Sequence, residues 1–429
     1  MIIDMENTYI GILVGMVSLV VSLTVYPLVL KYARGHGIVD NPNARKLQRV
    51  PIPVMGGVVV YAGILVGSII LNMFMHSEIM VYGLIGMTMM MVIGVWDDIK
   101  DISATLRFVI EIALVTAFMV LTDTYIDDFH GLWGVNALPA WVSYPLSIVA
   151  GVGIINAVNL IDGVDGYSSG YGMLACMCFG LAFWTVWSMT MVCLTLIVIG
   201  ALLPFFLHNV FGVKSKMFIG DGGTLMLGML MTVYAFFALS SNQRCDSLED
   251  KGIGLVAFVL AVLCIPVFDT LRVMTMRLLR GRSPFSPDKT HLHHLFIDMG
   301  FSHLGAALFI LFINAMVVLV WLLSWKLGAS VDVQFYIVLA LGMAVTFGFY
   351  KVMKIQQNGG LLDEEGYPQG TKLWHMMYKV GNWTHREQKR SWHILRQLVD
   401  GPLMGGLTDL RNYGFTEMAQ DQRLTKAEV

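Results

Sequence analysis

Charged side chains are scarce in this chain of 429 residues, because Asp, Glu, Lys and Arg together make up only 14% of it. Average soluble proteins carry about 25%, so the composition excludes a soluble globule with an ordinary surface. The net charge of −2 gives no general attraction to nucleic acid. Cysteine is also rare, with five residues and no CxxC pair or disulfide framework. Residues 1–8 are acidic where a cleavable signal is basic, so the first apolar run is interpreted as a retained helix.

Long apolar runs are what the sequence has in excess. Hydrophobic residues make up 56% of it, which also excludes disorder for most of the chain. A helix needs about 20 mostly apolar residues to cross a membrane. Eleven segments meet this requirement, near 9–30, 56–75, 79–96, 103–121, 141–158, 168–186, 189–207, 223–240, 253–274, 304–325 and 331–352. The sequence therefore predicts an all-α, polytopic membrane protein of about eleven transmembrane helices, with a transmembrane domain at 1–354 and a tail at 355–429.

The distribution of basic residues gives the expected orientation, because Lys and Arg are retained on the cytoplasmic side of a membrane. Of the 28 basic residues, sixteen fall in one set of loops, three in the alternate set and nine in the tail. This predicts an N-terminus outside and a cytoplasmic tail. Within the tail, residues 371–398 mix aromatic and basic side chains. That mixture indicates either an amphipathic helix at the inner membrane face or a small helical appendage without chemistry.

Two groups of acidic and amide side chains fall on the predicted cytoplasmic side. The segment WDDIKD closes the third span, and NAVNLIDGVDG follows the fifth. Taken singly, a solvated turn with a helix cap explains the first, and local Asp-Gly turn chemistry explains the second. The alternative is that both present carboxylates and amides to a polar ligand. The residues concerned are Asp97, Asp98, Asn159, Asp162 and Asp165.

Two further groups on the same side contain glycines and histidines. The segment FIGDGGT opens the eighth span, and its glycine N–H groups at a helix N-terminus would form an anion cradle, unless Asp221 is only the N-cap. The segment SPDKTHLHH has three histidines, a pattern that zinc sites also show. No cysteine is near and four basic residues surround it, so phosphate oxygens suit it better than a cation. This group contributes His291, His293 and His294.

Convergence of these acidic groups would require a cation. Two unit charges about 4 Å apart repel by about 4 kcal/mol at an effective dielectric constant near 20. Oxygen-only ligands beside a phosphate favour Mg²⁺ or Mn²⁺. Carboxylates for a metal, with histidine and basic side chains for phosphates, at one membrane face indicate an active site for phosphoryl transfer to a lipid substrate.

The four motifs together resemble those of the polyprenyl-phosphate N-acetylhexosamine-1-phosphate transferases. The resemblance extends over roughly residues 9–350. The family patterns DDxxD, NxxNxxDGxDG, FxGDxGS/T and HxHH are matched in this order, the first by Asp97, Asp98 and Asp101. The HxHH form is similar to that of the branch using UDP-N-acetylglucosamine, whereas the peptidoglycan branch has three consecutive histidines. The first cytoplasmic loop is similar to a DxPxxRKxHxxPxPxxGG pattern that includes Lys46, but Gln48 stands where the family commonly has His.

This resemblance implies a Mg²⁺-dependent phosphotransferase of a bacterial inner membrane, serving a cell-envelope glycan pathway such as lipopolysaccharide or capsule biosynthesis. It would transfer N-acetylhexosamine 1-phosphate, with N-acetylglucosamine (GlcNAc) favoured, from the UDP-sugar to undecaprenyl phosphate and release UMP. Asp98 and Asp221 would hold the metal, and Asp97 would position or deprotonate the lipid phosphate. The nucleotide and the phosphates would contact Lys46, Asn159, Asp162, Asp165, His291, His293 and His294. A nucleic-acid partner is not expected, and a homodimer is left open.

Two alternatives remain from the sequence. One is the same chemistry on a UDP-muramoyl-pentapeptide. The other is a secondary transporter, a class that places ionisable groups near the membrane midplane. Only Glu111 lies clearly inside a span here, and Arg107, four residues before it, is expected to form a structural pair with it.

Overall fold

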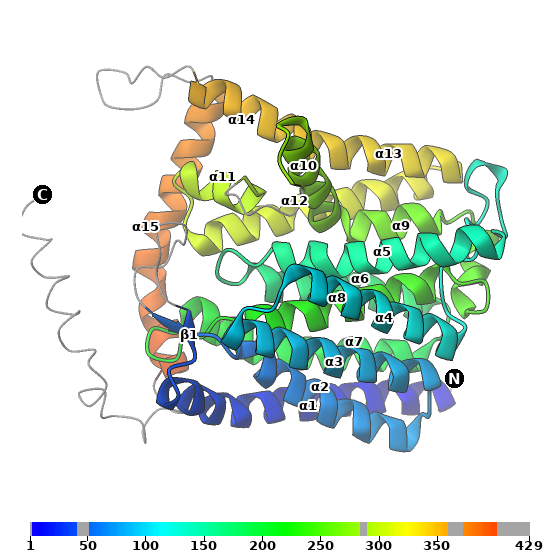
Figure 1. Cartoon of the computed structure of the whole chain (residues 1–429), viewed down its shortest axis with the longest axis horizontal. Coiled ribbons are helices and arrows are strands. Elements are labelled where there is room, and N and C mark those ends of the chain that lie inside the picture. Colours follow the sequence, from blue (N-terminus) through cyan, green and yellow to red (C-terminus); the bar gives the residue numbers. More distant parts are fainter. Residues whose placement is uncertain (1, 41–50, 284–289, 359–371, 401–429) are drawn as a thin grey trace, which may run out of the picture.

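The computed structural model describes residues 2–40, 51–283, 290–358 and 372–400, and helices account for most of them (Figure 1). The strands in these residues are β1 (Val39–Asp40) and β2 (Ile52–Pro53), which form one short antiparallel pair. The all-α prediction is therefore confirmed. The helices that follow one another along the chain run side by side, so their ends gather at two opposite faces.

The helix bounds agree closely with the predicted spans. Nine helices of the described residues are long and apolar enough to cross a membrane, and a bent pair raises this number to ten, so the chain is a multi-pass membrane protein. The sixth predicted span is α6, which packs against α7 but begins with polar residues and is not among the helices found apolar enough to cross a membrane. Apart from the ninth, the predicted spans correspond to α1 (Ile2–Gly35), α2 (Gly56–Phe74), α3 (Glu78–Lys100), α4 (Ala104–Thr122), α5 (Ala140–Leu160), α6 (Tyr167–Thr185), α7 (Met189–Phe211), α8 (Gly220–Leu239), α12 (His303–Lys326) and α13 (Val331–Met343).

Helix α8 is the centre of the bundle. Nearly all of its side chains are buried, and it contacts α2, α3, α5, α6 and α9 (Leu255–Val262). A helix that is apolar on every side is stable only when other helices surround it, which is the case here. Because α8 is enclosed along its whole length, its N-terminal residues, including Asp221, lie inside the protein at one face of the bundle.

The ninth predicted span is broken rather than straight. Helices α9 and α10 (Cys264–Leu279) meet at an angle of 75° next to Leu263. Pro266 lacks a backbone N–H and cannot continue the hydrogen bonding of α9. The buried side chain of Asn314 completes the break, because its Oδ1 accepts the Ile265 N–H at 3.0 Å and its Nδ2 donates to the Val262 carbonyl at 3.1 Å. The bend lays α10 against α5 and α13 and brings its polar residues Asp269 and Arg272 next to His291 and Thr290.

Helix α15 (Lys372–Asp400), the last helix of the described residues, lies across the ends of α7 and α12, at the left of Figure 1. The predicted helix over residues 371–398 is therefore confirmed, while its contact with the membrane surface stays a prediction. Asp400 fixes the end of this helix by accepting the backbone N–H groups of Val213, Lys214 and Ser215. Helix α14 (Phe349–Asn358) precedes it. The predicted division of the chain at residue 354 stays a prediction.

Candidate active site

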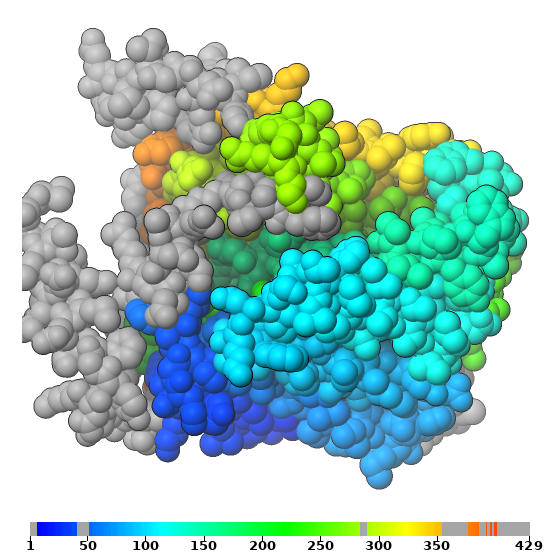
Figure 2. Space-filling model, in the orientation of Figure 1, coloured from blue at the N-terminus to red at the C-terminus, as the bar shows by residue number. Residues whose placement is uncertain are grey.

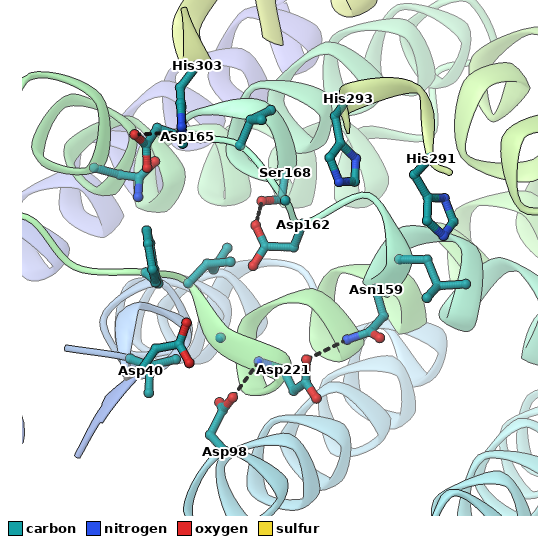
Figure 3. A pocket seen from close by; sticks show the side chains of 18 of the residues that line it. Asp40, Asp98, Asn159, Asp162, Asp165, Ser168, Asp221, His291, His293 and His303 are labelled. Carbon is teal, nitrogen blue, oxygen red and sulfur yellow. Dashed lines mark hydrogen bonds and ion pairs between the residues drawn. The ribbon is translucent and has the colours of Figure 1, made fainter. Parts of the chain in front are cut away.

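A polar pocket of about 520 Å³ opens at the face where α3 and α5 end and α8 begins. Its size falls in the range of ordinary small-molecule sites. Figure 2 shows a hollow in the surface between the cyan α4 and the green segment above it, with teal residues at its floor. In Figure 3 the carboxylates of Asp98 and Asp221 lie on one side of the pocket, and the rings of His291 and His293 lie on the other.

The pocket brings together the predicted residues of all four motifs. Those motifs come from α3, the α5–α6 turn, the start of α8 and α11 (Leu292–Asp298), segments that are far apart in the sequence. Of the predicted residues, only Lys46 lies outside the residues that the structure describes. The lining includes Asp97, Asp98, Asn159, Asp162, Asp165, Asp221, His291, His293 and His294, together with Asp40 and His303.

The first turn of α8 is closed by a carboxylate from α3. The backbone N–H groups of Asp221 and Gly222 donate to the two oxygens of Asp98, at 3.0 and 3.3 Å. Gly220 has a φ of +72°, and a Cβ there would lie 2.4 Å from Asp98 Oδ2, so the close approach requires glycine. The predicted anion cradle exists, but its anion is Asp98 itself. Asp221 is not the N-cap, which is Ile219.

Asp221 is positioned by two neighbours. The Nδ2 of Asn159 donates both to Asp221 Oδ1, at 2.9 Å, and to the Thr224 hydroxyl, at 2.8 Å. The other carboxylate oxygen lies 3.5 Å from the Arg107 guanidinium, which also pairs with Asp97 at 3.0 Å. The Asp221 side chain keeps 40% of its surface exposed, so it remains open to a ligand in the pocket.

Arg107 forms one ion pair that the sequence predicts and two that it does not. Its predicted pairing with Glu111 is confirmed by a separation of 3.6 Å, and Asn156 also donates to that carboxylate. Its contacts with Asp97 and Asp221 were not predicted. In addition, the second oxygen of Asp97 accepts the Ile102 N–H at 2.7 Å. Both oxygens of Asp97 are thus engaged within the protein, which places the acidic pair of α3 in two different environments.

The turn between α5 and α6 presents Asp162 to the pocket. Its carboxylate accepts the Ser168 hydroxyl at 2.5 Å. The side chain is open to the pocket itself but otherwise surrounded by protein, and this enclosure raises the pKa of Asp162 to about 7. The Ser168 hydrogen bond opposes the rise in pKa, while the negative charges of Asp221 and Asp165 add to it. Asp162 therefore takes up a proton near neutral pH unless a cation binds nearby.

Asp165, three residues further on, is held by a lysine and a histidine. Lys216 lies 2.5 Å from its carboxylate, and His303 at the start of α12 lies 3.2 Å from it. Burial alone would raise the pKa of Asp165, but the hydrogen bond from His303 and the charge of Lys216 hold it below its ordinary value. Asp165 thus joins the α5–α6 turn to two other segments, and the sequence indicated neither partner.

The histidine motif is fixed by a carboxylate that the motifs did not reveal. Asp269, buried on α10, accepts the Nδ1 of His291 at 3.0 Å and the Leu292 N–H at 3.2 Å. Its other oxygen accepts two guanidinium N–H groups of Arg272, which is itself fully buried. Asp269 and Arg272 reach this position because of the bend between α9 and α10.

His293 lies on the inner side of the histidine motif. Its ring packs against the α5–α6 turn so closely that a Cβ on Gly163 would lie 2.0 Å from Nε2. Burial, together with the neighbouring His294 and His291, lowers the pKa of His293 well below its ordinary value. Its ring is therefore neutral at physiological pH. Glycine is therefore required at position 163 by the contact with His293, and not only by the backbone of the α5–α6 turn.

The carboxylates suit a divalent cation shared with a substrate. Mg²⁺ commonly binds through one or two carboxylates together with phosphate oxygens and water, so it does not need a complete cage of protein ligands. Asp221 offers exposed oxygens, and Asp98 is held beside it by the first turn of α8. The donors at this side of the pocket are oxygens, which fits Mg²⁺ or Mn²⁺.

Comparison with known proteins identifies the family. The family model described as glycosyl transferase family 4 matches residues 80–239, which include three of the four motifs. The chain is 29% identical over 299 residues to the probable undecaprenyl-phosphate N-acetylglucosaminyl 1-phosphate transferase of Bacillus subtilis (strain 168), covering 70% of this chain and 80% of that protein. It is 31% identical over 277 residues to the undecaprenyl-phosphate alpha-N-acetylglucosaminyl 1-phosphate transferase of Shigella flexneri, covering 63% and 72%. The chain therefore belongs to glycosyl transferase family 4.

Proposed function

We propose that this chain transfers GlcNAc 1-phosphate from UDP-GlcNAc to undecaprenyl phosphate and releases UMP. The observation that carries the proposal is the pocket at the start of α8, where the acidic motifs face the histidine motif across one cavity. The relatives named as undecaprenyl-phosphate N-acetylglucosaminyl 1-phosphate transferases support the choice of donor sugar and lipid. The membrane-spanning bundle around the pocket suits a lipid acceptor.

The reaction joins two anions. An oxygen of the lipid phosphate attacks the sugar-side phosphorus of the UDP-sugar, and the bond from that phosphorus to the bridging oxygen breaks as UMP leaves. Because charge accumulates on the oxygens around the phosphorus, electrostatic stabilisation is the main requirement for catalysis. A Mg²⁺ or Mn²⁺ ion held by Asp98 and Asp221 would supply much of this stabilisation by neutralising phosphate oxygens.

The side chains around this position take different parts. Asp269 holds the Nδ1 edge of His291, which leaves Nε2 as the ring atom available to a phosphate oxygen. Asn159 orients Asp221. Asp162, which titrates near neutral pH, would contact the nucleotide together with His293. Asp97 would act on the lipid phosphate only after exchanging its bond with Arg107 for one to the substrate.

We also propose that the pocket faces the cytoplasm, where UDP-sugars are made. The basis is the excess of Lys and Arg in the loops on this face, sixteen against three. A cysteine replacing Ser283, exposed just after α10, would be labelled by a membrane-impermeant thiol reagent only after the membrane is opened. A cysteine replacing Ser247, exposed at the other face, is the matched control and would be labelled in intact cells. The reverse pattern would overturn the orientation.

A product assay tests the proposed activity. The purified chain is incubated with undecaprenyl phosphate, Mg²⁺ and separate UDP-sugars, and both UMP and lipid-linked product are measured. We expect UDP-GlcNAc to give equal amounts of the two. Product with UDP-muramoyl-pentapeptide instead would replace the donor in this proposal. Uptake of a solute into vesicles without UMP release would overturn it in favour of a transporter.

A further inference from the structure

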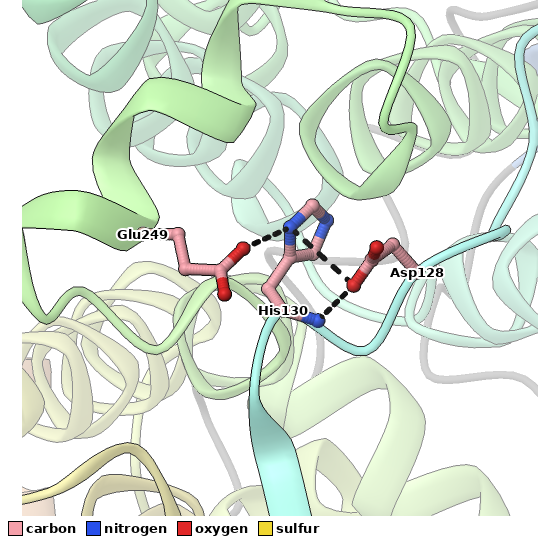
Figure 4. Close-up of side chains that lie close together, drawn as sticks. All are labelled: Asp128, His130 and Glu249. Carbon is pink, nitrogen blue, oxygen red and sulfur yellow. Dashed lines mark hydrogen bonds and ion pairs between the residues drawn. The ribbon is translucent and has the colours of Figure 1, made fainter. Parts of the chain in front are cut away.

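A second cluster of ionisable side chains lies at the face opposite the pocket. The loop between α4 and α5 contributes Asp128 and His130, and η2 (Arg244–Lys251), between α8 and α9, contributes Asp246 and Glu249. Helix α8 has 20 residues and begins at the pocket, so its length separates the two sites by about 30 Å. Figure 4 shows the His130 ring between the carboxylates of Asp128 and Glu249.

The His130 ring is buried without hydrogen-bond partners. None of its surface is exposed, and within the described residues neither ring nitrogen makes a hydrogen bond. Native proteins seldom leave a buried polar group in this condition, so it calls for an explanation. Its Nδ1 points at three carboxylate oxygens, 3.5 Å from Asp246, 3.5 Å from Glu249 and 3.9 Å from Asp128. Ordinary N–H···O hydrogen bonds are about 2.7–3.2 Å long, so all three separations are too long.

The two separations of 3.5 Å match those between ligands of one metal ion, and that of Asp128, at 3.9 Å, is slightly longer. Tetrahedral Zn²⁺ with bonds of about 2.0–2.2 Å places neighbouring ligand atoms about 3.3–3.6 Å apart. One ligand atom from each of Asp128, His130 and Glu249 lies within 4.8 Å of the other two.

We infer that Asp128, His130 and Glu249 bind a divalent transition-metal ion, with Zn²⁺ the best match, and that Asp246 lies within reach as a fourth ligand. An imidazole nitrogen among carboxylates favours zinc over magnesium, which prefers oxygen ligands. The carboxylates alone repel one another, and a cation removes that repulsion. The donor set therefore differs from the all-oxygen set of the pocket.

The backbone holds His130 ready for this role. His130 has a φ of 51°, a left-handed conformation that residues other than glycine rarely adopt and that often marks a binding site. The backbone pairs across the loop on either side of it, since the Phe129 N–H donates to the Asn136 carbonyl and the Gly131 N–H to the Val135 carbonyl, both at 3.1 Å. The loop is thus a closed turn that presents the ring inward.

The ion would join two loops that already touch. Asp127 accepts the Ser241 N–H at 2.8 Å, a bond between the α4–α5 loop and the segment after α8. A metal bound by residues of both loops would strengthen this link and stabilise the folded chain. This role does not depend on the proposed phosphotransferase activity.

The test measures zinc on the purified full-length chain. After treatment with a chelator, the protein is equilibrated with ZnCl₂ in excess MgCl₂ and desalted, and bound zinc is measured by mass spectrometry. CoCl₂ serves as a spectroscopic probe, because Co²⁺ in a tetrahedral site absorbs visible light. The test variants are Glu249→Gln and His130→Gln. The controls are His76→Gln, which changes an exposed histidine in the α2–α3 turn at the same face, and Asp98→Asn in the pocket.

We expect one zinc per chain in the parent and in both controls. Glu249→Gln should weaken zinc binding at least about tenfold, and the cobalt absorption should be lost in His130→Gln. Glu249 is partly exposed, so its variant should fold normally, and an unchanged elution volume checks this. Failure of the parent to retain zinc would overturn the inference, as would equal retention by Glu249→Gln and the parent.

Discussion

Replacing Asp98 with asparagine separates the structural and chemical roles of this carboxylate. In the folded chain it accepts the N–H groups of Asp221 and Gly222. Asparagine keeps one oxygen for these donors, so the loss is one charge-assisted hydrogen bond, about 1.5–3 kcal/mol, plus about 0.3–1 kcal/mol from the N-terminus of α8. Against this, the variant removes repulsion with Asp221, which for two charges about 5 Å apart is about 3 kcal/mol at an effective dielectric constant near 20.

These opposing terms nearly cancel, so without a divalent cation the free energy of unfolding of Asp98→Asn should change by less than about 2 kcal/mol. The catalytic effect has no such compensation. Losing a metal ligand or key electrostatic group should lower the rate by about 10²–10⁴-fold, or about 2.7–5.4 kcal/mol in the barrier. The variant should therefore remain folded and be nearly inactive.

The assay follows UMP release and thermal unfolding on the same preparations. Asp332→Asn is the matched control, because Asp332 also accepts a backbone N–H, that of Trp133 at 2.6 Å, but lies at the opposite face. This control should keep the parental rate. Turnover by Asp98→Asn within a few-fold of the parent would refute the assignment. An inactive variant that is also unfolded would show that the lost hydrogen bond outweighs the relieved repulsion.

Three further predictions follow from the same structure. Asp269→Asn removes the carboxylate that pairs with the buried Arg272 and should lower the free energy of unfolding by about 3–5 kcal/mol. The double variant Asp269→Asn, Arg272→Met should recover part of this loss, and an unchanged melting temperature in the single variant would contradict the pairing. The pKa of Asp162 is about 7, so its carboxylate is largely neutral at pH 6 and no longer adds its negative charge near Asp221. Mg²⁺ held by Asp98 and Asp221, measured by its thermal stabilisation, should therefore bind several-fold more weakly at pH 6 than at pH 8, and equal affinities would contradict this effect. Asn314→Leu removes both hydrogen bonds at the α9–α10 bend and should lower the free energy of unfolding by about 2–5 kcal/mol. An unchanged free energy of unfolding would show that Asn314 does not stabilise the bend.

The meeting of the four motifs could be predicted because each lies at the end of an apolar run. Membrane thickness fixes the length of such runs, so motifs that end alternate spans share one face. Asp98, Asp162 and Asp221 line one pocket for this reason. The distinct environments of Asp97 and Asp98 could not be predicted, since the difference depends on Arg107 and on the close approach of α8.

Two other features depend on contacts distant in sequence. The role of Asp269 follows from the bend after α9, and that bend depends on Asn314 from another helix, whereas the sequence alone predicts a straight span. The His130 cluster joins two loops with ordinary polar composition and has no recognisable spacing. Hydrophobic periodicity carries no information about either contact.

In the proposed reaction the sugar-side phosphorus moves to the lipid within this pocket. The most direct measurement uses UDP-GlcNAc radiolabelled at that phosphorus, with purified chain, undecaprenyl phosphate and Mg²⁺, followed by separation of lipid and water-soluble products. We expect label in the lipid fraction, unlabelled UMP in equal amount, and loss of both in Asp221→Asn. Label that leaves as UDP, or lipid labelling that persists in Asp221→Asn, would contradict it.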